Sequence, residues 1–222
     1  MPSKFSRELF DRIPIVGILR NVPPLTVPIL ARYYADAGLT TLEVTMNSDE
    51  ALTTITRLVQ DFDGKLNIGA GTVCTLDDLD KALAAGAQFI VTPILQEEVI
   101  KACVQQQIPV FPGAYSPTEI YKAWHLGATM VKVFPATKLG ASYIKEVLAP
   151  MNYLKLLPTG GINLDNLTEF MKAGAAGLGL GSQLFPQKLI EEGRWERLSE
   201  LFRDLVATYE NYKMSKLKSS IA

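Results

Sequence analysis

The strongest constraint on the fold of this 222-residue chain is a regular alternation of short apolar runs with longer amphipathic segments. Eight runs have the length of buried strands, and the segments between them show helical spacing of their apolar residues. Strands that alternate with helices predict a parallel sheet, because each helix returns the chain to the same edge. The predicted strands span residues 13–19, 41–45, 66–70, 89–92, 109–111, 130–134, 154–157 and 177–180.

Glycines punctuate the predicted helices. Gly38, Gly86, Gly127 and Gly174 each stand just beyond a helical pattern, where a left-handed residue closes the last turn. A further helix is predicted at each terminus, over 3–12 and from Trp195 to Tyr212. The eight inner helices are predicted at about 24–37, 49–62, 76–85, 96–107, 117–126, 141–149, 163–173 and 186–193.

Eight such units without long insertions predict a single (β/α)8 barrel, the TIM barrel, with an N-terminal and a C-terminal helix. An open doubly wound sheet would produce the same alternation, but the count of eight favours the closed barrel. No linker or composition shift divides the chain, so residues 1–222 are expected to form one domain. The barrel core is expected over 13–185, and residues 213–222 are expected to fray.

Composition excludes several classes of function. The formal net charge of −1 provides no basic field for nucleic acid or an anionic membrane. One histidine and two cysteines are too few for a His/Cys metal site, although an all-carboxylate Mg²⁺ site stays open. The N-terminus lacks the apolar stretch of a signal peptide, and no run approaches the roughly 18 apolar residues of a membrane span. We therefore expect a cytoplasmic enzyme.

Two charged residues stand where a barrel strand should face inward. Lys132 lies between Val131 and Val133, and alternation along a strand turns it away from the side of the two valines. The same argument turns Glu43 inward from the second strand. Burial disfavours an ammonium, so an inward lysine tends to lose its proton. The sequence thus predicts an amine and a carboxylate inside the barrel.

An uncharged amine can attack a ketone to form a Schiff base, and a nearby carboxyl can move the protons that this chemistry requires. A buried salt bridge between Lys132 and Glu43 would explain the same two residues, but it would contribute little stability. The parallel-barrel topology favours the catalytic interpretation, because reactive groups gather at the carboxyl ends of barrel strands.

Glycine-rich turns follow the last two predicted strands. Gly160 and Gly161 follow strand seven, and Gly181 and Ser182 follow strand eight, where barrels commonly hold phosphate. Paired glycines let backbone N–H groups approach an anion closely. Arg20 ends the first strand, and its guanidinium could bind a carboxylate or a phosphate at the mouth of the barrel.

The ordered motifs GILRNV, LEVTMNS, GAGTV, VTP, PVFPGA, VKVFPA, PTGGI and GLGS span residues 13–185. In this order and spacing they resemble the class I aldolases of 2-keto-3-deoxy-6-phosphogluconate (KDPG) and its galactonate epimer (KDPGal). The resemblance implies cleavage of KDPG to pyruvate and glyceraldehyde 3-phosphate. The galactonate epimer or 4-hydroxy-2-oxoglutarate (KHG) is the alternative main substrate. The resemblance further implies a homotrimer that needs no metal or organic cofactor.

The resemblance also assigns roles to individual residues. Lys132 matches the Schiff-base lysine, and Glu43 matches a general acid/base that acts through a bound water. Gly160, Gly161, Gly181 and Ser182 match the phosphate cradle. The positions implied to contact the rest of the substrate are Arg20, Thr72, Pro93, Phe134 and Thr159.

One position departs from the family pattern. Members that act mainly on the gluconate compound often carry an arginine four residues after the glutamate, where it holds the carboxylate of the keto acid. This chain has Asn47 there, as galactonate-type members do, so carboxylate binding must rely on backbone N–H groups or on Arg20. Two other functions remain open from the residues alone: a phosphate-binding isomerase, and an inactive sensor of a phosphorylated sugar acid.

Overall fold

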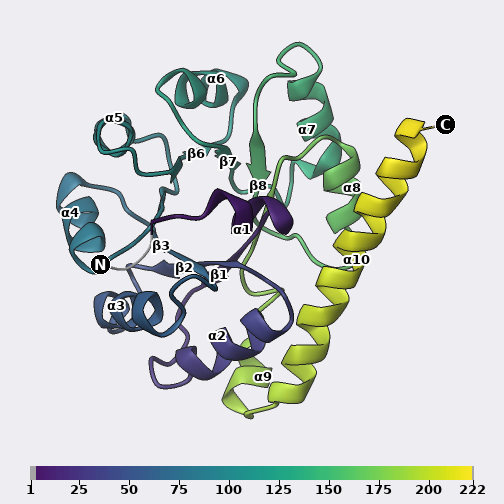
Figure 1. Ribbon diagram of the computed structural model, residues 1–222. Coiled ribbons are helices and arrows are strands. Elements are labelled where there is room, and N and C mark those ends of the chain that lie inside the picture. Colours follow the sequence, from purple (N-terminus) through teal and green to yellow (C-terminus); the bar gives the residue numbers. More distant parts are fainter. Residues whose placement is uncertain (1–3, 222) are drawn as a thin grey trace.

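The computed structural model describes residues 4–221, with side chains as far as residue 218. Strands lie at the centre and helices surround them (Figure 1). The strands are β1 (Ile15–Leu19), β2 (Thr41–Thr45), β3 (Asn67–Gly71), β4 (Ile90–Val91), β5 (Val110–Phe111), β6 (Gly113–Ala114), β7 (Val131–Val133), β8 (Leu156–Pro158) and β9 (Leu178–Leu180).

Each predicted inner helix is present, and most begin or end one to four residues inside the predicted bounds. The predicted N-terminal helix begins at Arg7, and residue 3 of that prediction lies outside the described residues. The helices are α1 (Arg7–Arg12), α2 (Val27–Asp36), α3 (Ala51–Asp61), α4 (Leu76–Ala84), α5 (Glu97–Gln105), α6 (Pro117–His125), α7 (Gly140–Leu148), α8 (Leu167–Lys172), α9 (Gln187–Glu191) and α10 (Trp195–Ile221).

The strands are all parallel but form two hydrogen-bonded sheets rather than one continuous barrel. The larger has the order β5-β4-β3-β2-β1-β9, and the smaller has the order β6-β7-β8. The predicted fifth strand, 109–111, is present as β5, and β6 follows as a separate strand after Pro112, since proline interrupts a ladder. On the other side, a single bridge between Thr159 and Gly179 joins the sheets. The structure thus has a curled parallel α/β sheet. The parallel arrangement agrees with the prediction, but the strands do not form the continuous closed barrel that was predicted.

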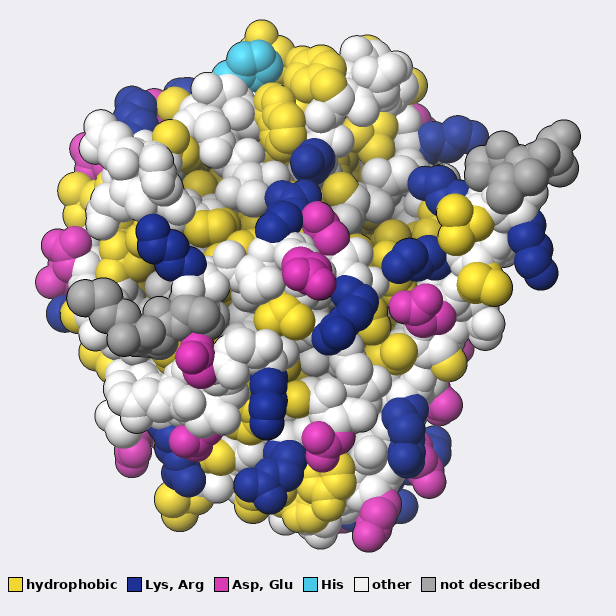
Figure 2. All heavy atoms as spheres, in the orientation of Figure 1, with side chains coloured by type: hydrophobic (Ala, Val, Ile, Leu, Met, Phe, Trp, Pro, Cys, Tyr) yellow, Lys and Arg dark blue, Asp and Glu magenta, His cyan; other side chains and the backbone are white. Residues whose placement is uncertain are grey.

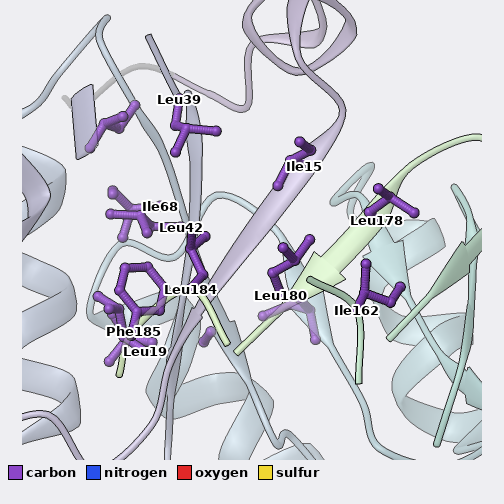
Figure 3. Close-up of a cluster of buried hydrophobic side chains, with 14 of the residues drawn as sticks. Ile15, Leu19, Leu39, Leu42, Ile68, Ile162, Leu178, Leu180, Leu184 and Phe185 are labelled. Atoms are coloured by element: carbon purple, nitrogen blue, oxygen red, sulfur yellow. The ribbon is translucent and has the colours of Figure 1, made fainter. Parts of the chain in front are cut away.

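The two faces of the curled sheet bury separate groups of apolar side chains. The larger group lies between strands and helices and includes Leu42 and Val44 of β2. Figure 3 shows part of it, with side chains from β1, β2, β3 and β9. A smaller group, which includes Val16 and Ile18 of β1, fills the inner face. Alternation along each strand therefore separates an outer face from an inner one, as predicted.

Helix α1 covers one end of the strands. Its Phe10 lies 5.8 Å from the ring of Phe111, and Phe111 lies 5.4 Å from Phe89. These rings are buried at the end opposite the carboxyl ends of the strands. The inner face is therefore packed with aromatic side chains at that end, and space for a ligand must lie at the other.

The glycines predicted to end helices adopt the required conformation. Gly38, Gly86, Gly127 and Gly174 have φ between 93° and 101°, in the left-handed region that a Cβ disfavours. Each carries the chain directly toward the next strand. The prediction of shared cap chemistry is confirmed.

The C-terminal helix is longer than predicted. It was predicted from Trp195 to Tyr212, and α10 continues to Ile221, while the expected fraying of residues 213–222 stays a prediction. The segment contains no glycine or proline to end the helix, and lysine, methionine and leucine favour helix. Residue 222 lies outside the described residues. Figure 1 shows this helix running along the outside of the molecule, beside α8 and α9.

Within residues 4–221, no helix combines the length and hydropathy required to cross a bilayer. Figure 2 shows positive and negative side chains interspersed on the face that α1 covers.

Candidate active site

Lys132 lies on the inner face of β7 and is only 4% exposed. Its neighbours Val131 and Val133 belong to the outer apolar group, so Lys132 points inward. The Nζ atom lies 5.1 Å from the centre of the Phe134 ring. Burial lowers the pKa of Lys132, and the charge of Arg20 lowers it further, while Glu43 opposes both. The amine is therefore much more available at neutral pH than that of a surface lysine.

Glu43 occupies the equivalent inward position on β2, between Leu42 and Val44, and is 1% exposed. Burial raises its pKa, against the opposing charges of Lys132 and Arg20. Its Oε1 atom is fully buried and has no hydrogen-bond partner among the described residues. An orphaned buried carboxyl oxygen is costly, so it is expected to serve a ligand or a water.

Gly71 gives the Glu43 carboxyl group its space. It is the last residue of β3, and a Cβ placed on it would lie 1.7 Å from Glu43 Oε1. Only glycine allows the carboxyl group to occupy this place beside the backbone. Gly71 of the GAGTV motif is therefore required for steric reasons, and not only to form a turn.

A cavity of about 350 Å³ opens above Lys132 at the carboxyl ends of the strands. Its walls come from the segments after β1, β7, β8 and β9. Most predicted site residues line it, namely Arg20, Lys132, Phe134, Thr159, Gly160, Gly161, Gly181 and Ser182. Residues far apart in the sequence therefore meet at one opening, as the parallel topology predicts.

Four predicted site residues do not line this cavity. Glu43 is buried away from it, and Pro93 and Thr72 are half-buried in neighbouring loops. Thr72 has a φ of 57°, which belongs to the left-handed region. Asn47 is exposed on the loop after β2. Asn47 does not line the cavity, whereas Arg20 does, and its guanidinium is available there for an anionic group.

The turn after β8 has the backbone that its two glycines allow. Gly160 and Gly161 have φ values of 102° and 73°, and a Cβ on Gly161 would press against Thr137 at 3.0 Å. Asn166 Nδ2 donates to Gly161 O at 2.9 Å and holds the turn against the start of α8. Both glycines line the cavity, so their backbone N–H groups are candidates for binding an anion.

Several residues of the cavity wall were not predicted from the sequence. Helix α9 contributes Gln187, Ile190 and Glu191, and Gln187 Nε2 donates to Glu191 Oε1 at 2.7 Å. Asn21 and Val22 line the cavity from the loop after β1. The eighth helical segment was predicted, but the placement of one side of it against the cavity depends on the loop at Gly181, which periodicity does not reveal.

None of the described residues form a cluster of three or more His, Cys, Asp or Glu side chains suited to a metal ion. Lys132, Arg20, Ser182 and Glu191 bring an amine, a guanidinium, a hydroxyl and a carboxylate to the cavity wall, and the Glu43 carboxyl is buried outside that wall.

Comparison with known proteins places this site in a family. The family model described as KDPG and KHG aldolase matches residues 10–201. The 2-dehydro-3-deoxy-6-phosphogalactonate aldolase of Escherichia coli is 34% identical over 175 residues, covering 78% of this chain and 85% of the relative. The 2-dehydro-3-deoxy-phosphogluconate aldolase of Treponema pallidum is 33% identical over 195 residues, covering 87% and 92%.

Solved structures agree with the sequence comparison. A designed cube-shaped protein cage, made by fusing symmetric oligomeric domains, superposes with a TM-score of 0.86 and 31% identity, over 94% of this chain and 76% of that one. A KDPG aldolase from Legionella pneumophila, with pyruvate captured as a covalent carbinolamine, gives a TM-score of 0.82 and 29% identity, over 89% and 96%.

Proposed function

Because the chain belongs to the KDPG and KHG aldolase family, we propose that it cleaves a phosphorylated 2-keto-3-deoxy sugar acid through a Schiff base on Lys132. Members of this family are aldolases, which are lyases. The observation that carries the proposal is the burial of Lys132 beside the cavity, with its pKa lowered. A free amine at neutral pH is what attack on a ketone requires.

The proposed reaction follows from the positions of the two inward residues. The uncharged amine of Lys132 adds to the C2 ketone, and loss of water leaves a protonated imine. The C4 hydroxyl then gives its proton to a base, and the imine accepts the electron pair as the C3–C4 bond breaks, so that glyceraldehyde 3-phosphate leaves. Protonation of the resulting enamine at C3 and hydrolysis of the imine then release pyruvate and restore Lys132. The imine serves as the electron sink, so the proposed steps use no metal or organic cofactor.

Glu43 is proposed to move the protons of this sequence. Burial raises its pKa, which favours a carboxyl group that can hold a proton and donate it as well as accept one. No hydrogen bond or ion pair joins Glu43 to Lys132 among the described residues, and Glu43 Oε1 lacks a partner. A water between the two groups would satisfy this oxygen and carry the proton.

The remaining wall of the cavity is proposed to bind the two anionic ends of the substrate. Gly160, Gly161, Gly181 and Ser182 would hold the phosphate through N–H groups and a hydroxyl. Arg20 supplies positive charge at the same opening. The other predicted contacts, Thr72, Pro93, Phe134, Thr159 and Asn47, are retained as proposals, with Phe134 and Thr159 in the cavity wall.

KDPG is the proposed main substrate, with the galactonate epimer or KHG as the alternative. The relatives include aldolases of both phosphorylated epimers at similar identity. The test is a side-by-side measurement of pyruvate release from the three compounds, coupled to lactate dehydrogenase. Preference for KDPG supports the proposal. If the protein prefers another of the three compounds, that compound is assigned as the main substrate. If none of the three releases pyruvate, the proposed aldolase activity is refuted.

The same assay separates two other functions. An isomerase that used Glu43 as its base would consume a sugar phosphate without releasing pyruvate. An inactive sensor would bind the sugar acid and leave it intact. Burial of an amine favours the aldolase over both, because neither needs a desolvated nucleophile.

The architecture is proposed to be one domain in which the two sheets together enclose a closed barrel. The backbone supports this at both seams: Thr129 N, just before β7, donates to Val110 O of β5, and Ala176 N, just before β9, donates to Leu156 O of β8. A homotrimer is also proposed, on the family resemblance and on the similarity to the domain of the designed cage. Light scattering of the purified protein tests the trimer.

A further inference from the structure

A chain of three polar groups ties the loop after β1 to the loop after β2. The backbone N–H of Asn21 donates to Ser48 Oγ at 2.9 Å. Ser48 Oγ in turn lies 2.7 Å from Thr45 Oγ1, and Ser48 N donates to Thr45 O at 2.9 Å. Thr45 is the fully buried last residue of β2. The loop after β1 is thereby anchored to the rigid end of a central strand.

The anchored N–H belongs to the peptide that links Arg20 to Asn21. Fixing a peptide plane fixes the backbone on both sides of it, because ω is rigid. Asn21 has a φ of 53°, a left-handed conformation that asparagine tolerates better than most residues. The bond to Ser48 therefore determines the direction in which Arg20 leaves the backbone.

Arg20 is the residue that this anchoring affects most directly. It lines the cavity, and its charge acts on the pKa of both Lys132 and Glu43. Arg20 is the first residue after β1 and itself belongs to no helix or strand. Asn47, the residue before Ser48, is exposed and lies outside the cavity wall.

We propose that Ser48 is a positioning residue, whose hydroxyl holds the Arg20–Asn21 peptide so that Arg20 can bind an anionic end of the substrate. The inference rests on the proposed aldolase function. Either the carboxylate or the phosphate of the substrate is an oxyanion that a guanidinium binds in a fork. Ser48 itself touches neither the substrate nor the reacting atoms.

The test compares Ser48→Ala with Ser48→Thr, which keeps the hydroxyl, in steady-state kinetics on the phosphorylated keto acid. Loss of one neutral hydrogen bond is worth about 1 kcal/mol, so Ser48→Ala should raise KM about fivefold. The value of kcat should change less than about twofold, because Lys132 is untouched. Thr53→Ala, which removes an exposed hydroxyl from α3, is the matched control. Ser48→Cys fills the same space with a poor acceptor and tests the bond again.

The decisive comparison repeats Ser48→Ala in an Arg20→Ala background. If Ser48 acts through Arg20, the second substitution leaves KM unchanged there, since the group it positions is gone. An equal rise in KM with and without Arg20 would overturn the proposal, as would an unchanged KM in folded Ser48→Ala and Ser48→Cys.

Borohydride trapping with pyruvate distinguishes the two anionic ends. A rise in the half-saturating pyruvate concentration for Ser48→Ala assigns Arg20 to the carboxylate. An effect confined to the phosphorylated substrate assigns it to the phosphate. Either result supports the positioning role. Absence of an adduct in the wild-type protein would instead refute the proposed aldolase mechanism. This outcome differs from the unchanged KM that would refute the positioning role of Ser48.

Discussion

Gly71→Ala should lower kcat strongly while leaving the fold intact. The added methyl would meet Glu43 Oε1 at 1.7 Å, Cδ at 2.3 Å and Cγ at 2.7 Å. Ordinary contacts between such atoms are at least about 3.4 Å, so the carboxyl group must move by roughly 1–2 Å. Gly71 does not have a positive φ, and alanine therefore introduces no backbone strain. A displacement of about 1 Å in a catalytic group can cost about 100-fold in rate, and we expect kcat to fall by that order.

The assay is pyruvate release under saturating substrate, with thermal unfolding measured on the same sample. A double-variant cycle supplies the control. In a Glu43→Asp background the carboxyl is one methylene shorter, so Gly71→Ala should cost much less there. A folded Gly71→Ala protein with kcat within threefold of wild type would refute the steric reasoning. An equal loss in both backgrounds would refute the dependence on Glu43.

Three further results are expected. Lys132→Met should abolish turnover yet raise the free energy of unfolding by about 1 kcal/mol or more, because it removes a buried amine. Burial lowers the pKa of Lys132 in the folded state, so the unfolded chain binds more protons than the folded one. The wild-type protein therefore gains stability as the pH rises toward the usual lysine pKa. The stability advantage of Lys132→Met, measured by urea unfolding, should shrink over that range. Tyr34→Phe should destabilise by about 1–3 kcal/mol in the same experiment, because the buried Tyr34 hydroxyl accepts from Gly17 N and donates to Thr41 O. Glu43→Gln should slow the exchange of the pyruvate methyl protons with D₂O, followed by NMR, more than it slows formation of the borohydride adduct on Lys132.

Strand parity made the interior of the site predictable. Lys132 and Glu43 each stand between two aliphatic residues, and alternation alone assigns them to the inner face. The structure places all four flanking side chains in the outer apolar group. The glycine caps were predictable for the same reason, since a left-handed φ after a helix has few other solutions.

Loops were less predictable, because their geometry depends on contacts between distant segments. The family resemblance assigned Asn47 to the substrate, and the structure leaves this residue exposed on the loop after β2, outside the cavity wall. Its neighbour Ser48 ends the LEVTMNS motif, but no role was predicted for it, because a single serine in a loop has no periodic pattern. The hydrogen bond to Asn21 joins residues 27 positions apart, which periodicity cannot reveal.

The division of the sheet at Pro112 had a visible cause that the prediction did not use. Pro109–Phe111 was predicted as one short strand, and the next residue is a proline, which cannot donate to a ladder. Gly113 then resumes pairing with Lys132 of β7. A proline inside a strand pattern is the signal that would have predicted two segments.

Incubation with pyruvate and sodium borohydride, followed by peptide mass spectrometry, tests the Schiff base on Lys132 directly. Reduction of the imine should leave a stable adduct on the peptide that contains Lys132. The adduct should be absent from Lys132→Met and from samples without pyruvate. A folded wild-type protein that releases pyruvate from a keto acid, yet carries no adduct on Lys132, would contradict the proposed mechanism.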